Sequence, residues 1–114
     1  MIVSDAYSRR CALSSSKVLH VLESAHIKPY AANGTHSPTN GILLREDLHT
    51  LFDLGYLTVT PEYKVEVSKK IKEEFDNGHE YYSMHGKKIH LPEIEQFRPS
   101  QAMLSWHNEK IFRP

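Results

Sequence analysis

The sequence contains only one cysteine, Cys11, among its 114 residues. A single thiol can form neither an internal disulfide framework nor a cysteine-only zinc site within one chain. Long apolar runs are also missing, since no 18 consecutive residues are apolar, and the sequence therefore predicts no membrane span. Residues 1–6 lack the charged flank and apolar run of a secretory signal, so we expect a cytoplasmic protein.

The sequence has no excess of either charge, because 14 Lys and Arg residues balance 14 Asp and Glu residues. Residues 1–45 carry a net charge of +3 and residues 46–114 a net charge of −3, which is a mild asymmetry. A non-specific nucleic-acid binder usually has a strongly basic patch. Any phosphate contact must therefore be local or be assisted by a metal ion. The eight histidines are the unusual count, since histidine is the commonest metal ligand.

The length and a hydrophobic content of 39% fit one globular domain over residues 1–114. We expect a functional core at about residues 18–54 and a supporting part at about 55–114. Within the core, residues 18–26 are typical of a strand that ends before Lys28-Pro29, and residues 29–39 have loop composition. Residues 42–44 predict a second strand. A short helix then begins at Glu46-Asp47 and ends at Gly55.

The supporting part shows no chemistry of its own. Residues 57–60 and 64–67 alternate around a turn and predict a β-hairpin. Ser68 is placed to cap a short helix over residues 69–76. Residues 81–84 and 88–91 flank His85-Gly86, which predicts a second hairpin. Ser100 follows a proline and is a good N-cap for a terminal helix that carries Trp106.

Four polar residues of the core stand out by their spacing: His26, Asn40, His49 and Asp53 follow one another at intervals of 14, 9 and 4 residues. Residues four apart lie on the same face of a helix, so His49 and Asp53 are expected side by side. An imidazole and a carboxylate together can bind one divalent ion. The sequence therefore predicts a metal-binding pair on the helix, next to a histidine at the end of a strand.

This arrangement resembles the HNH endonuclease family, whose core is the ββα-metal finger. The resemblance runs from about Tyr7 to Phe112 and is greatest for HNH domains of bacterial restriction-type proteins. Its motifs are Arg10-Cys11-Ala12, Ala25-His26-Ile27, Asn40-Gly41 and the segment from Leu44 to Asp53. The resemblance implies an α+β fold, in which a ββα-metal finger is supported by β-hairpins and a C-terminal helix.

The resemblance also implies a metal-dependent endonuclease that hydrolyses phosphodiester bonds of DNA, with double-stranded DNA as the expected partner. His26 would be the general base that deprotonates the attacking water. His49 and Asp53 would hold one divalent ion, with Mg, Mn, Ni and Zn all open. Asn40 would pin the loop and orient His26 through a hydrogen bond. Arg45 or Lys28 would hold a flanking phosphate.

One position departs from the family pattern. Many HNH nucleases carry a metal ligand directly before the base histidine, where this chain has Ala25. The ion would then rest on two protein ligands plus water and phosphate oxygens, or recruit another group such as Glu23. Glu23 and His26 are three residues apart and point to opposite faces of an extended strand, so this recruitment would need a bulge.

The alternative function is a catalytically idle nucleic-acid-binding or scaffold domain that kept the HNH fold after losing a ligand at Ala25. Taken singly, His26 also fits a strand-end histidine, Asn40-Gly41 a turn, and His49 with Asp53 a solvated ion pair. Cys11 is expected as a small buried hydrophobe and Trp106 as a core residue. Of the remaining histidines, His36 in the loop is a candidate substrate contact. The others are expected at the surface or in packing: His20, His79, His85, His90 and His107. A homodimer and a place within a longer restriction-type protein both stay open.

Overall fold

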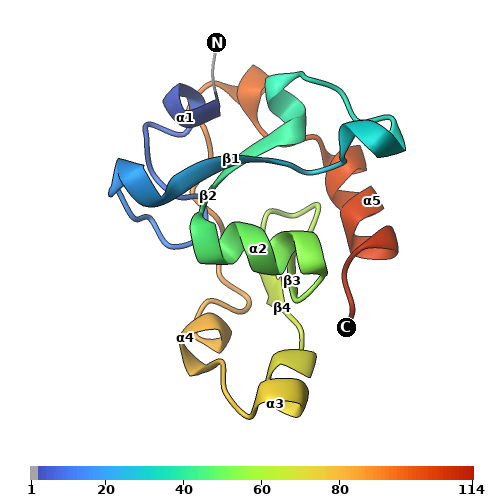
Figure 1. Cartoon of the computed structure of the whole chain (residues 1–114). Helices are drawn as coiled ribbons and strands as arrows, with labels where there is room; N and C mark the ends of the chain where they lie inside the picture. The colour runs from blue at the N-terminus through green and yellow to red at the C-terminus, as the bar shows by residue number, and fades with distance from the viewer. Residues whose placement is uncertain (1–2) are drawn as a thin grey trace.

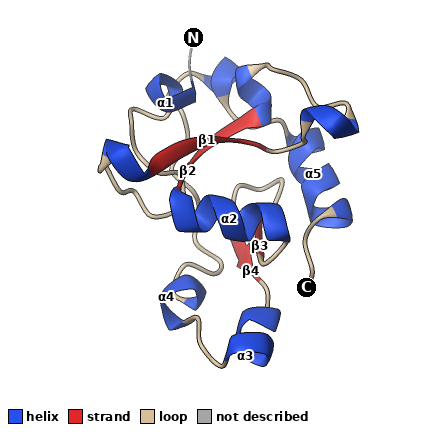
Figure 2. Cartoon of the chain, viewed as in Figure 1, coloured by secondary structure: helices blue, strands red, loops and turns tan. Residues whose placement is uncertain are grey.

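The computed structural model describes residues 3–114 and combines short helices with two small antiparallel sheets (Figure 2). In chain order the elements are α1 (Val3–Ala6), β1 (Leu22–His26), β2 (Gly41–Arg45), α2 (Glu46–Leu54), β3 (Leu57–Val59), β4 (Val65–Val67), α3 (Lys70–Phe75), α4 (His79–Tyr82) and α5 (Gln101–Lys110). Short 3₁₀ turns lie between them, at Leu19–Val21, Tyr30–Ala32, Pro38–Asn40 and Glu95–Phe97. The mixture confirms the α+β class.

The functional core is an antiparallel hairpin crossed by a helix. β1 pairs with β2 in an unbroken register that runs from Leu22 opposite Arg45 to His26 opposite Gly41. α2 follows β2 directly and packs against both strands (Figure 1). β2 is buried on both faces because α2 covers one face and α1 packs on the hairpin as well. The expected order of strand, loop, strand and helix is therefore confirmed.

The end of α2 is held by the C-terminal helix. Gly55 ends α2 in the left-handed conformation with φ of 85°, as the sequence predicts for a glycine C-cap. The ring of His107 in α5 stacks on Phe52 at a centroid distance of 3.7 Å, and its Nε2 donates to the Phe52 carbonyl at 2.9 Å. Because Phe52 precedes Asp53, α5 fixes the turn of α2 that carries half of the predicted metal pair.

One sequence-based boundary needs correction. The first strand begins at Leu22 rather than at residue 18, because residues 19–21 form a 3₁₀ turn. β2 ends at Arg45, opposite Leu22, so earlier residues have no strand to pair with. The hairpin of β3 and β4 is confirmed, with Tyr63 in its turn at φ of 65°.

The second predicted hairpin is wrong. Residues 79–82 form α4, and residues 88–91 contribute a single bridge between Lys88 and Lys64. Tyr81 and Tyr82 both turn toward the protein, where their hydroxyls donate to the Asp47 carboxylate at 2.9 Å and the Ser68 carbonyl at 2.6 Å. Successive side chains of a strand point to opposite faces, so only a helical turn allows both bonds.

The hydrophobic core lies between the β1–β2 hairpin, α2 and the β3–β4 sheet. Its largest fully buried side chains include Tyr7, Phe52 and Leu104, and Cys11 is buried beside them as expected. Ser100 caps α5 by accepting the Met103 N–H at 3.3 Å. None of the helices described between Val3 and Pro114 has the length and apolar character that crossing a bilayer requires.

Candidate active site

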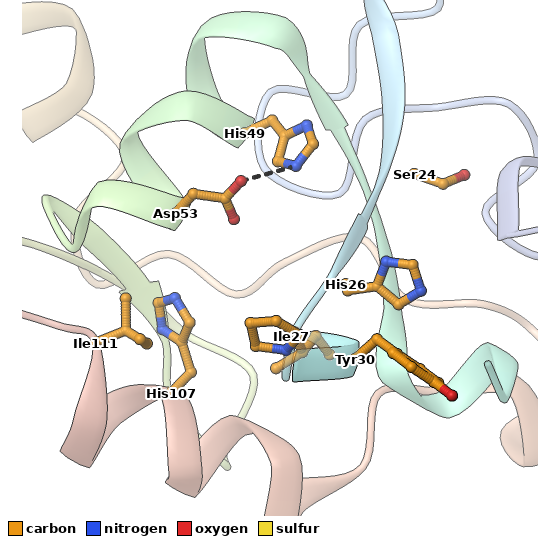
Figure 3. Close-up of a pocket in the computed structure, with 9 residues that line it drawn as sticks. Ser24, His26, Ile27, Tyr30, His49, Asp53, His107 and Ile111 are labelled. Atoms are coloured by element: carbon orange, nitrogen blue, oxygen red, sulfur yellow. Dashed lines mark ion pairs between the residues drawn. The ribbon is translucent and has the colours of Figure 1, made fainter. Parts of the chain in front are cut away.

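The predicted pair on α2 is assembled as the sequence indicates. His49 and Asp53 lie one helical turn apart, and His49 Nε2 is 3.1 Å from Asp53 Oδ2 (Figure 3). The His49 side chain is 25% exposed and the Asp53 side chain 57% exposed, so both groups remain accessible from solvent. The pair forms because residues i and i+4 of a helix share a face.

Glu23 of β1 contacts the same imidazole from its other edge. Its Oε1 lies 2.7 Å from His49 Nδ1. Each ring nitrogen of His49 therefore faces a carboxylate oxygen, Glu23 at Nδ1 and Asp53 at Nε2. The strand and the helix are thus joined at the imidazole. Strand alternation argued against Glu23 as a ligand, because Glu23 and His26 point to opposite faces of β1 and the site was expected on the face of His26.

The donor pair fits a divalent ion. Two ligand atoms bound at about 2.1 Å to one octahedral ion lie roughly 3 Å apart, which matches the separation of His49 Nε2 and Asp53 Oδ2. Among residues 3–114, no three or more His, Cys, Asp or Glu side chains form a group suited to a metal ion. Ala25 is buried and offers no donor atom. The protein would therefore supply two ligands, with oxygen atoms of water or substrate completing the shell.

His26 lines the same cavity but has a different orientation. The cavity has a volume of about 290 Å³, and His26, His49, Asp53 and His107 are among its lining residues. In Figure 3 the His26 ring points away from the pair on α2. This agrees with strand alternation, because Glu23 and Ala25 share the face toward α2 whereas Ser24 and His26 share the other. The sequence-based expectation that His26 faces the pair directly is therefore not met.

The loop after β1 surrounds His26 with aromatic rings. His36 meets the His26 ring edge-on at a centroid distance of 5.8 Å. Tyr30 stacks on the other side of His36 at 5.3 Å and is 72% exposed. His36 is thus placed next to His26, and its role as a substrate contact stays a prediction. Trp106 lies under the Lys28 amine at 5.5 Å and is half-buried rather than a fully buried core residue.

Asn40 pins the loop, as the family resemblance implies. Its side-chain carbonyl accepts the Lys28 N–H at 2.8 Å, and its amide donates to the carbonyls of Lys28 and Thr35, each at 2.8 Å. These bonds occupy the amide of a completely buried residue and are all made to the backbone. The expected hydrogen bond from the Asn40 side chain to His26 is therefore not formed, since both amide hydrogens are used by the loop. Next to His26, the Ile27 N–H donates to the Asn40 backbone carbonyl at 2.9 Å.

The two residues expected to contact phosphate differ in their surroundings. Arg45 donates from Nε and Nη2 to the Asp47 carboxylate at 2.6 and 3.0 Å. This hydrogen bond from Arg45 is the main reason that the pKa of Asp47 is lowered. Lys28 has its amine over Trp106, beside the loop that leaves β1. Lys28 is therefore the better placed of the two for a phosphate, and both roles stay predictions.

The electrostatics of Asp53 reflect its neighbours. Burial is the largest effect and raises the pKa of the Asp53 carboxyl. The Glu23 carboxylate raises this pKa further, whereas His49 and His26 lower it. A carboxylate that is partly desolvated and lies near another carboxylate is stabilised by a nearby positive charge. The site therefore favours a cation beside Asp53.

The hairpin, the helix that crosses it and the His49–Asp53 pair define a ββα finger. Residues 11–60 match the sequence profile described as HNH endonuclease, a segment that contains both strands, α2 and every predicted site residue. Residues 11–60 are therefore similar to the HNH endonuclease family, and the resemblance noted from the sequence is confirmed. No curated protein matches the chain.

A solved structure shows that the likeness in fold extends beyond the profile match. The chain aligns with the modification dependent TagI restriction endonuclease at a TM-score of 0.65 and 20% sequence identity. The alignment covers 96% of this chain and 35% of that chain. The supporting part, about residues 55–114, is thus part of the shared fold, and the chain spans about a third of the length of that endonuclease.

Proposed function

We propose that this chain is a metal-dependent endonuclease domain that hydrolyses DNA phosphodiester bonds. The observation that carries the proposal is the His49–Asp53 pair at 3.1 Å, which shares one cavity with His26 at the end of β1. The similarity of residues 11–60 to the HNH endonuclease family supports it. The similarity in fold to a restriction endonuclease is consistent with DNA as the substrate.

The residues divide the chemistry between them. His49 and Asp53 would hold one divalent ion, Mg, Mn, Ni or Zn. When bound, such an ion supplies Lewis-acid stabilisation for the scissile phosphate and the departing oxygen. His26 accepts the proton of the attacking water as general base. Asn40 keeps the backbone around His26 in place, and Lys28 and Arg45 are the proposed contacts to flanking phosphates.

The orientation of His26 constrains how DNA binds. Because His26 and the α2 pair lie on opposite faces of β1, the substrate must lie across the end of this strand. The attacking water would then be on the side of His26, His36 and Tyr30. An exposed aromatic ring such as that of Tyr30 can pack against a sugar or base.

The test is cleavage of supercoiled plasmid in Mg²⁺, Mn²⁺, Ni²⁺ or Zn²⁺. We expect the unaltered protein to cut with at least one ion, and His26→Ala to lose at least about a hundredfold in rate, the usual contribution of a general base. His79→Ala, at an exposed histidine of α4, is the matched control and should cut normally. The proposal is refuted if the unaltered protein cuts with none of these ions, or if His26→Ala cuts as fast as His79→Ala.

A catalytically idle domain that binds nucleic acid is the second candidate. The buried Ala25 favours it, since this position cannot supply a ligand. Such a domain would retain DNA in a salt-dependent way, show no metal-dependent rise in melting temperature and cut no plasmid. The single-domain boundaries, a homodimer and a place in a longer restriction-type protein are further proposals.

A further inference from the structure

The hydrogen bond between Glu23 and His49 joins two elements that are 26 residues apart in the sequence. Glu23 Oε1 lies 2.7 Å from Nδ1, whereas Asp53 Oδ2 lies 3.1 Å from Nε2 on the other edge of the ring. The two carboxylates therefore approach opposite edges of one imidazole. His49 and Asp53 both line the cavity, whereas Glu23 is not among its lining residues.

The strand geometry explains how Glu23 reaches this position without distortion. The register of β1 with β2 is unbroken and places Glu23 opposite Leu44, so no bulge is present. Glu23 and Ala25 share the face of β1 that α2 covers. The small side chain at Ala25 is buried, whereas the Glu23 side chain is 48% exposed.

We propose that Glu23 is a positioning residue that orients His49 for metal binding and does not itself bind the ion. The inference rests on the proposed function, because it concerns the ion that His49 and Asp53 would hold. A carboxylate that accepts the Nδ1–H of an imidazole fixes the ring and leaves the Nε2 lone pair for a metal. Such outer partners typically change metal affinity by about 10- to 100-fold.

This role compensates for the missing ligand at Ala25. A site with only two protein ligands loses affinity if either ligand rotates freely, because ordering a side chain on binding costs conformational entropy. Asp53 and His49 sit on one rigid helix, and the Glu23 contact removes the remaining rotation of the ring. The Nε2 edge of the His49 ring is therefore already oriented toward Asp53 before an ion binds.

Calorimetric titration of the full chain with MnCl₂ tests the proposal. The variants are Glu23→Ala, Glu23→Gln, His49→Ala and, as a charge-matched control, Glu62→Gln in the β3–β4 turn. We expect Glu23→Ala to bind Mn²⁺ about 10- to 100-fold more weakly than the unaltered protein. Glu23→Gln should recover most of that loss, because the amide oxygen still accepts the Nδ1–H. Glu62→Gln should bind normally.

A spectroscopic measurement separates positioning from general stability. In the Zn²⁺-loaded, ¹⁵N-labelled protein, the Nδ1–H proton of His49 should give a signal protected from exchange, and Glu23→Ala should abolish it. Melting in EDTA should move by only a few degrees in each Glu23 variant, since this side chain is half exposed.

Each result decides between defined explanations. Unchanged Mn²⁺ affinity in Glu23→Ala would overturn the inference alone. Equal losses in Glu23→Gln and Glu23→Ala would also overturn it, because they would assign the carboxylate to direct ligation. If the unaltered protein binds neither Mn²⁺ nor Zn²⁺, the proposed metal dependence fails and this inference fails with it.

Discussion

Mild acid is expected to destabilise the protein through one buried histidine, His107. Its Nε2 donates to the Phe52 carbonyl at 2.9 Å, and its Nδ1 lies 2.6 Å from the Thr58 hydroxyl, which donates to it. The ring is 1% exposed, and burial lowers its pKa from 6.5 to about 4, partly offset by the hydrogen bond to Phe52. The bond from Thr58 requires a neutral imidazole, because a protonated Nδ1 could not accept, whereas Nε2–H can donate to Phe52 in either form.

The magnitude follows from proton linkage. Above pH 6.5 His107 is neutral in the folded and the unfolded chain, and its contribution to stability is fully present. As the pH falls from 6.5 toward 4, His107 is protonated in the unfolded chain but stays neutral in the folded chain. The free energy of unfolding then declines by up to about 1.4 kcal/mol per pH unit. The shift in pKa gives a total loss of about 3 kcal/mol, with no further loss from this residue below pH 4.

Urea denaturation between pH 4 and 8 measures this effect. Other groups titrate over the same range, so the useful quantity is the difference between the unaltered protein and His107→Gln at each pH. That difference should be largest near pH 7.5 and shrink by about 3 kcal/mol toward pH 4. His20→Gln, at an exposed histidine, should give a flat difference. A flat difference for His107→Gln as well, or an NMR titration midpoint of His107 near 6.5, would refute the reasoning.

Three further substitutions test the framework of the site. Asn40→Ala removes all three side-chain bonds that pin the loop and should lower the free energy of unfolding by about 2–4 kcal/mol in urea titration; a loss below about 1 kcal/mol would contradict this role. Gly55→Ala strains a residue at φ of 85° and places a Cβ against the Ile111 carbonyl. We expect the free energy of unfolding to fall by about 2 kcal/mol or more in the same assay, and an unchanged urea midpoint would contradict this strain. Ala25→Asp buries a carboxylate on the face toward α2 and should cost about 3–5 kcal/mol in EDTA, with Mn²⁺ restoring more stability than it adds to the unaltered protein. Equal Mn²⁺ effects on the two proteins would show that position 25 does not face the ion.

The fold of the first half was predictable because its signals are local. The proline after Lys28, the Asn-Gly pair at which β2 begins and the glycine after α2 are all local signals of where an element starts or stops. The second predicted hairpin failed for a non-local reason. Residues 81–84 have the composition of a strand, yet the partners of Tyr81 and Tyr82 are Asp47 and Ser68, which no pattern around position 81 reveals.

The candidate site divides in the same way. The His49–Asp53 pair depends only on helical spacing, and the sequence predicts it directly. The orientation of His26 depends on which face of β1 the helix covers, which the spacing of 14, 9 and 4 residues does not specify. For this reason Glu23 was considered only as an unfavoured direct ligand, and its contact with His49 was not predicted. His107 was assigned to surface or packing, and its partners in the core were not predicted either. Strand parity with Ala25 was the available signal for Glu23, whereas the contacts of His107 join positions 49 and 55 residues apart.

The alternation of β1 separates the two halves of the proposed chemistry. Its face toward α2 carries Glu23 and Ala25, and Glu23 contacts the His49 ring there, where the proposed cation would bind. Its other face carries Ser24 and His26, next to His36, where the proposed attacking water would lie. In the proposed one-metal reaction, the base would activate the attacking water and the cation would stabilise the leaving oxygen, and in-line attack puts these on different sides of the reacting phosphorus. A single extended strand can do this because its successive side chains point to opposite faces. A residue inserted between Glu23 and His26 would turn one of them to the wrong face. Such an insertion should therefore reduce the cleavage rate more than replacing Lys28 or Arg45 does.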